Sequence, residues 1–159
     1  MVNIPELSMD AIAENDMCFG CGKANPIGLK LKFSKDRDSV KAKFIPTENH
    51  QGWPGYAHGG VLMSVIDEAI GWVTFLANVY NVTAKIEVRL KSMARLGEPL
   101  IVTARITSQS KRLLETEVDL KRKDGTLVAE AKSIQFIVNT TEDESLPTIS
   151  RRMARRIDG

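Results

Sequence analysis

The sequence lacks several features that would direct its interpretation at once. Aromatic residues make up 6% of the 159 residues, and the chain has only two cysteines and two histidines. Two cysteines are too few to define a disulfide scaffold, and no uninterrupted apolar run approaches the roughly 18 to 20 residues of a membrane span. Residues 1–16 are acidic rather than basic and apolar, so no signal peptide is predicted. We therefore expect a cytoplasmic protein that does not associate with membranes.

A large net charge is also missing. The chain has 22 Lys and Arg residues against 20 Asp and Glu residues, for a formal charge of +2. This near balance gives no overall field that would hold a nucleic acid. The hydrophobic fraction of 43% and the charged fraction of 26% exclude collagen-like and disordered classes. At roughly 150 residues per domain, the length predicts one globular domain that needs no disulfides for stability.

Apolar and charged side chains alternate over much of the chain, which predicts strands with one buried and one solvent-facing side. The alternation begins at residues 29–33 and returns at 40–44, so these two runs are expected to form a hairpin. It resumes in four later runs, at residues 84–91, 100–107, 114–121 and 127–138. The last three of these runs are expected to form a meander.

Two segments between these runs follow a different pattern. Residues 46–58 contain two prolines and two glycines, and a long loop of this composition suggests function. Residues 59–77 are apolar on almost every face, with Ser64, Asp67, Glu68 and Thr74 as the polar interruptions. This second segment predicts a helix that is buried on all sides.

Together these elements predict an α+β fold in which one long buried helix is wrapped by a curved antiparallel sheet of about six strands. We expect this domain to span residues 18–138. It would follow an N-terminal extension, residues 1–17, with a short helix, and precede a basic C-terminal tail, residues 139–159. The sheet would leave unpaired edge strands, which predicts association with a second copy of the chain.

The start of the predicted helix carries the strongest chemical signal. His58 is followed by Gly59 and Gly60, and free N–H groups at a helix start suit a polarised carbonyl or a developing oxyanion. The two glycines would equally fit a tight turn into the helix. Asp67 lies nine residues after His58 in largely apolar surroundings. It can act as a general base or nucleophile, or like Glu68 it can face solvent or pair with a basic residue. The combination provides the minimum set of groups for hydrolysing an acyl bond.

A family resemblance rests on these residues. Residues 49–72, NHQGWPGYAHGGVLMSVIDEAIGW, resemble the loop and central helix of the hot-dog-fold acyl-CoA thioesterase superfamily, in particular its phenylacetate-type members with His-Gly-Gly, six residues and Asp. Residues 18–33 and 83–100 resemble the lead-in to the first strand and the strand after the helix. The resemblance covers roughly residues 18–138. It implies a hot dog fold, an acyl-CoA substrate, and a homodimer or homotetramer with active sites at the subunit interface.

The resemblance also implies roles for individual residues. It assigns Asp67 to activating water or attacking the thioester carbonyl, and the Gly60 N–H to polarising that carbonyl. His58 would shape the helix start, and Thr83 matches a Ser or Thr that holds the water from across the dimer. Asn49 matches a loop position where some members supply an amide, although loop capping explains it equally well.

Four further residues are candidates for substrate binding: Gly59, His50, Gln51 and Glu68. Because a helix rotates by roughly 100° per residue, Asp67 and Glu68 cannot face one pocket equally. No phosphate-binding loop or other pattern that requires a cofactor is present.

Cys18 and Cys21 form a Cys-x-x-Cys pair with three interpretations. A redox pair is expected at a strand-to-helix junction, but this pair precedes a strand. A zinc site needs two more ligands, and the two histidines belong to the thioesterase-like loop. We therefore interpret the pair as a buried turn with inert thiols, and predict no metal and no cofactor.

Two functional hypotheses follow. In the first, the chain is an acyl-CoA thioesterase that releases the free acid and coenzyme A. In the second, it is a non-catalytic hot-dog protein that binds an acyl-CoA as a sensor or carrier. Asp67 favours the enzyme, because a binding protein gains nothing from a carboxylate held beside the carbonyl.

Overall fold

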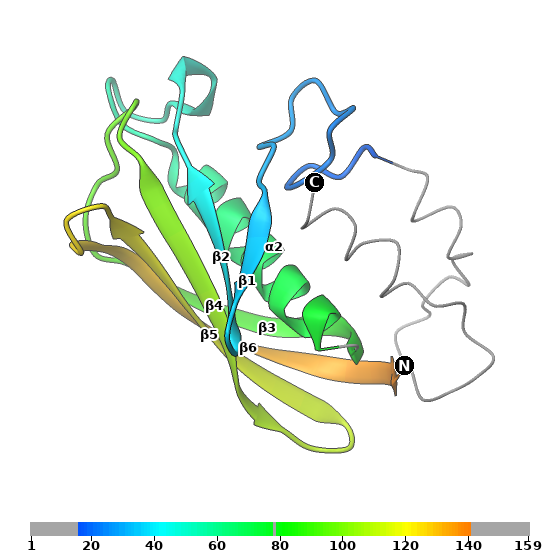
Figure 1. Cartoon of the computed structure of the whole chain (residues 1–159). Helices are drawn as coiled ribbons and strands as arrows, with labels where there is room; N and C mark the ends of the chain where they lie inside the picture. The colour runs from blue at the N-terminus through cyan, green and yellow to red at the C-terminus, as the bar shows by residue number, and fades with distance from the viewer. Residues whose placement is uncertain (1–15, 78, 141–159) are drawn as a thin grey trace.

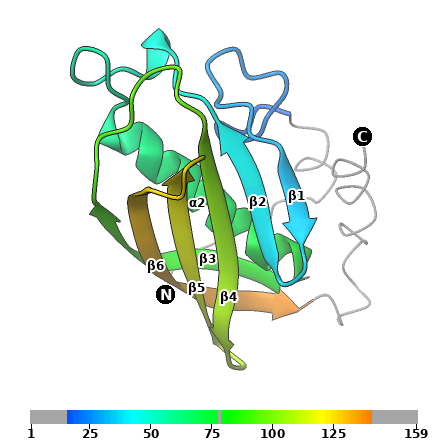
Figure 2. The ribbon, with the colours of Figure 1, turned by 60° about the vertical axis from the view of Figure 1, so that its left-hand side comes forward.

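One helix lies across a curved, six-stranded antiparallel sheet in the computed structural model, which describes residues 16–77 and 79–140 (Figure 1, Figure 2). The helix is α2 (Gly59–Leu76), and a short 3-10 turn, η1 (Glu48–His50), precedes it. The strands are β1 (Phe33–Asp36), β2 (Ser39–Phe44), β3 (Val79–Leu90), β4 (Leu100–Gln109), β5 (Leu113–Arg122) and β6 (Leu127–Thr140). Their order in the sheet is β1-β2-β4-β5-β6-β3. The predicted α+β fold and the β4-β5-β6 meander are confirmed.

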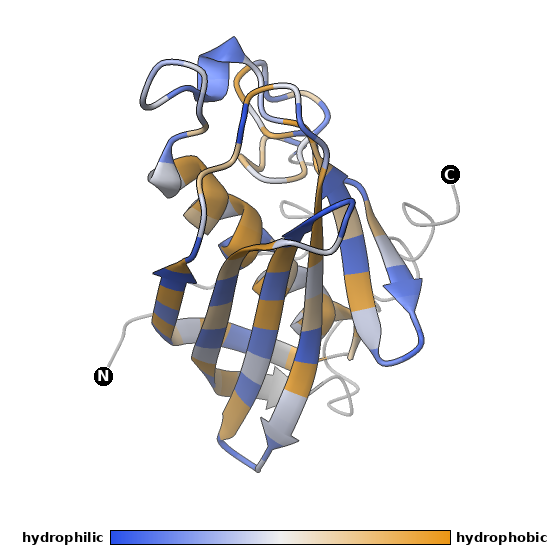
Figure 3. Ribbon diagram, turned by 90° about the vertical axis from the view of Figure 1, so that its left-hand side faces the viewer, coloured by the Kyte–Doolittle hydropathy of each residue, from blue (hydrophilic) through white to orange (hydrophobic). Residues whose placement is uncertain are grey.

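The core lies between α2 and the sheet. Val65, Ile66 and Ile70 of the helix are at most 1% exposed, and they pack against the inward side chains of the strands. Figure 3 shows polar and apolar residues in alternating bands along the strands. Burial of one side chain in two is the reason that these runs alternate.

The prediction of a helix buried on every face is wrong for the single chain. Met63, Asp67 and Gly71, four residues apart, form an exposed stripe along α2. A single sheet covers only one side of a helix, so the opposite side stays open. By length and composition α2 could also cross a membrane, but eight of its residues are buried. The helix therefore serves as the core helix of this domain.

The first predicted strand begins later than expected. Leu29 and Leu31 are buried and Lys30 is exposed, as the alternation indicated, but β1 starts only at Phe33. Lys30 has a positive φ of 56°, and the N–H groups of Leu29 and Leu31 donate to Phe19 O and Gly20 O. This segment is therefore hydrogen-bonded to the loop that contains Cys18 and Cys21, the cysteine loop, instead of to a neighbouring strand.

The two edge strands differ in length and exposure. β1 has 4 residues and β3 has 12. In β3 most described side chains are exposed or half-buried, including the apolar Ile86, Val88 and Leu90. The unpaired backbone groups of a long edge strand are a template for pairing with another chain. The predicted extension 1–17 and tail 139–159 lie almost entirely outside the described residues.

Candidate active site

The loop before α2 folds back on itself and leads into the helix start. The His58 N–H donates to His50 O over 2.8 Å, and Gln51 Oε1 accepts the Gly55 N–H over 2.8 Å. The His50 ring accepts the Thr47 N–H through Nδ1 over 2.9 Å, and burial lowers the pKa of this histidine. His50 and Gln51, both substrate-binding candidates, are thus used by the loop itself.

His58 caps the helix. Its Nδ1 accepts the Gly60 N–H over 2.9 Å, and its carbonyl accepts the N–H groups of Val61 and Leu62. The Gly60 N–H, which the resemblance assigns to the substrate carbonyl, therefore already has an acceptor within the chain. A side-chain cap of this type satisfies one of the free donors of a helix start.

The backbone N–H of Gly59, unlike that of Gly60, is available as a hydrogen-bond donor. Within residues 16–77 and 79–140, the Gly59 N–H has no hydrogen-bond acceptor. A Cβ at this position would lie 3.2 Å from Leu90 Cδ1, so the end of β3 packs closely against the helix start. The free N–H at the positive end of the helix dipole is a suitable donor for a carbonyl oxygen.

Asp67 lies on the exposed stripe of α2. Its carboxylate makes no hydrogen bond or ion pair with any other described residue. Partial burial among neighbouring protein atoms, followed by the negative charge of Glu68, raises the pKa of Asp67 above its ordinary value. A carboxylate with a raised pKa and free oxygens is a candidate general base or nucleophile.

Glu68 is directed away from this site. Its Oε1 accepts the Trp72 Nε1–H over 3.0 Å, and Cys18 Sγ lies 3.5 and 3.6 Å from its two carboxylate oxygens. Of the two neighbouring carboxylates, Asp67 is therefore the one left free, and Glu68 belongs to a cluster with the cysteines.

The side chains of Thr83 and Asn49 are exposed. Neither side chain makes a hydrogen bond in the described part of the chain. Thr83 pairs with Gln135 of β6 next to a bulge between Thr83 and Lys85. Since opposed residues of two strands point to the same side, Thr83 shares the sheet face of the fully buried Gln135.

The helix geometry separates Asp67 from the helix start. Eight residues between Gly59 and Asp67 correspond to about 12 Å of helix rise. A carbonyl bonded to the Gly59 N–H would lie about 3 Å beyond the helix start, in the direction away from Asp67. The two groups of one chain therefore do not reach one thioester.

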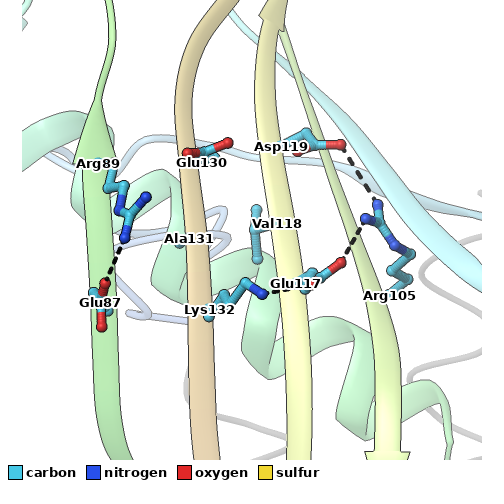
Figure 4. A pocket seen from close by; sticks show the side chains of 9 residues that line it. All are labelled: Glu87, Arg89, Arg105, Glu117, Val118, Asp119, Glu130, Ala131 and Lys132. Atoms are coloured by element: carbon cyan, nitrogen blue, oxygen red, sulfur yellow. Dashed lines mark hydrogen bonds and ion pairs between the residues drawn. The ribbon is translucent and has the colours of Figure 1, made fainter.

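A hollow lies away from these residues, on the outer face of the sheet (Figure 4). It has a volume of about 290 Å³ and charged walls, but its charges are already paired. Arg105 Nη2 lies 2.7 Å from Glu117 Oε2, and Lys132 Nζ lies 3.2 Å from Glu117 Oε1. None of the predicted site residues lines it.

Comparison with known proteins identifies the family. The model of the thioesterase superfamily matches residues 54–129. Human acyl-coenzyme A thioesterase 13 is 30% identical over 96 residues, which span 58% of this chain and 68% of the human protein. The chain belongs to the thioesterase superfamily. The predictions of this family and of a thioester hydrolase are thereby confirmed.

Solved structures of the thioesterase superfamily share the fold. The E. coli PaaI protein of the phenylacetic acid degradation operon has a TM-score of 0.70 at 20% identity, covering 82% of this chain and 91% of the PaaI chain. A hypothetical thioesterase from Streptococcus pneumoniae, solved with coenzyme A, has a TM-score of 0.66 at 22% identity, covering 69% and 87%. The predicted hot dog fold is therefore confirmed.

Proposed function

We propose that this thioesterase hydrolyses acyl-coenzyme A thioesters to a carboxylic acid and coenzyme A, in the cytoplasm. The human relative is named an acyl-coenzyme A thioesterase, and the streptococcal neighbour was solved with coenzyme A. The observation that carries the proposal is the free Asp67 carboxylate with its raised pKa. It lies on the helix whose start presents the unpaired Gly59 N–H.

The active unit would be a homodimer, alone or as half of a homotetramer, with its sites at the subunit interface. Because Asp67 and Gly59 of one chain are too far apart, each site would combine the helix start of one chain with Asp67 of the partner subunit. The long edge strand β3 supports this arrangement, since its outer edge has no neighbouring strand within the described sheet and can pair with a second copy. Thr83 lies on the same strand and would reach the site from the interface.

The reaction would proceed by attack on the thioester carbonyl. The Gly59 N–H would polarise the carbonyl oxygen, and Asp67 would take a proton from the attacking water. Collapse of the tetrahedral intermediate breaks the carbon–sulfur bond, and the proton passes to the leaving thiolate. The same position would also allow Asp67 to attack the carbonyl itself and form an anhydride that water hydrolyses. Asn49, exposed in the loop before α2, would contact the substrate.

Thiol release from a panel of short, medium, long and aromatic acyl-coenzyme A substrates tests the proposal. We expect catalytic release with at least one class, measured with a colorimetric thiol reagent. The matched control is the oxygen ester of the best acyl group, which reports nonspecific esterase activity. Tight calorimetric binding of the same substrates without turnover would contradict the enzyme and favour the acyl-CoA binding protein.

A further inference from the structure

Two cysteines and a glutamate that lie far apart in the sequence meet in the fold. One ligand atom from each of Cys18, Cys21 and Glu68 lies within 4.8 Å of the other two. The cysteines come from the loop before β1, and Glu68 comes from the middle of α2. Cys18 is exposed and the other two are half-buried, which differs from the predicted buried turn.

The backbone holds this cluster in place. The Gly22 N–H donates to Cys18 O over 2.9 Å, and a Cβ at Gly22 would lie 2.5 Å from Cys18 N, so the Cys-x-x-Cys-Gly turn requires glycine there. A Cβ at Gly20 would lie 2.2 Å from Glu68 Oε2. The glycines therefore let the turn approach Glu68 closely, and the hydrogen bond from Trp72 fixes the carboxylate from the other side.

The cluster contains one charge that no described basic side chain pairs with. No lysine or arginine in residues 16–77 and 79–140 forms an ion pair with Glu68. Two thiols and a carboxylate are ligand types of a divalent cation, which would take the place of the two thiol protons.

The distance between Cys18 and Glu68 matches the coordination geometry of zinc. Zn–S bonds of about 2.3 Å and Zn–O bonds of about 2.0 Å at a tetrahedral angle place sulfur and oxygen about 3.5 Å apart. Cys18 Sγ lies 3.5 Å from Glu68 Oε2 and 3.6 Å from Oε1. Thiolate donors select zinc over the oxygen-preferring magnesium and calcium. Cys18 is exposed, so an ion can reach the cluster from solvent.

We propose that Cys18, Cys21 and Glu68 bind one zinc ion, with water as the fourth ligand. Both thiols lose a proton when zinc binds, so affinity rises with pH. The ion joins the loop before β1 to the middle of α2, and thereby supports the helix that carries Asp67. Zinc binding is independent of the proposed hydrolysis because Asp67 is not a ligand.

Cobalt titration of the chelator-treated chain tests the site. We expect one equivalent of CoCl₂ to produce the thiolate-to-cobalt absorption band, and ZnCl₂ to abolish that band. Cys18→Ser and Cys21→Ser should lose the band, while Glu68→Gln, which keeps an oxygen acceptor for Trp72, should weaken cobalt binding by at least about tenfold. Asp67→Asn is the matched control because it removes the adjacent carboxylate, and it should bind cobalt as the wild type does.

Thermal unfolding and thiol counting complete the test. Zinc should raise the melting temperature of the wild type and of Asp67→Asn, but not of the cysteine variants, whose folding is checked by circular dichroism. Two reactive thiols with no cobalt band would overturn the proposal and leave the cluster as a hydrogen-bonded turn. No reactive thiols before reduction would indicate a disulfide instead. Unchanged cobalt binding in Cys18→Ser would also contradict the site.

Discussion

The cap on α2 permits a quantitative test of how the helix start is built. His58 Nδ1 accepts the Gly60 N–H over 2.9 Å, so His58→Ala leaves this donor without its protein acceptor. Loss of a side-chain N-cap costs about 1 kcal/mol of folding stability. In a chain of this length 1 kcal/mol corresponds to a melting-temperature shift of about 2–4 °C. We therefore expect His58→Ala to melt about 2–4 °C below the wild type.

His58→Asn is the matched control for the cap, because asparagine retains a side-chain acceptor and is among the preferred N-cap residues. It should recover most of the loss. Calorimetric scans of the three proteins at one fixed concentration make the comparison, since association also affects melting. Equal melting temperatures for His58→Ala and the wild type would refute the cap as a stabilising contact. An equal loss in His58→Asn would show that the imidazole acts through packing instead.

Three further predictions concern the proposed site. Because burial and the charge of Glu68 raise the pKa of Asp67, kcat/KM should fall with decreasing pH at a midpoint above about 4; a pH–rate profile with a lower midpoint would contradict a perturbed base. A raised native pKa means that the ionised carboxylate disfavours the folded state above that pKa. Asp67→Asn should therefore melt no lower than the wild type at neutral pH, and a lower melting temperature would argue for a stabilising carboxylate. Ile86→Lys on the edge strand β3 should sediment as a monomer and lose thiol release, whereas Ser34→Lys on β1 should do neither. Because Ile86 also packs against the core, circular dichroism must show that the variant is folded; a folded, dimeric Ile86→Lys would place the interface elsewhere.

Local periodicity accounts for the parts of the fold that could be predicted. The meander and α2 have clear apolar patterns over eight or more residues, and both appear in the structure at nearly the predicted bounds. The first strand was placed too early because Leu29 and Leu31 alternate in burial without pairing to a strand. A positive φ at Lys30 and hydrogen bonds to the cysteine loop explain this difference.

The site was predicted in its residue types but not in its contacts. Histidine is not among the preferred N-cap residues, so nothing in the motif indicated that the His58 side chain would accept a hydrogen bond from the Gly60 N–H. The contact between Glu68 and the cysteine turn joins positions 50 residues apart, and no local pattern reports such a pair. Helix rotation predicts that Asp67 and Glu68 point in different directions. Only the contact between Glu68 and the cysteine loop shows that Asp67 is the carboxylate left free.

The central claim is that Asp67 provides the chemical step. Its most direct test compares kcat of Asp67→Asn with that of the wild type on the preferred acyl-coenzyme A, with folding checked by circular dichroism and oligomeric state by sedimentation. Because a general base contributes about 10² to 10⁴ in rate, we predict a loss of kcat of at least about a hundredfold in a folded, dimeric protein. Turnover within a few-fold of the wild type would contradict the assignment and remove Asp67 from the mechanism.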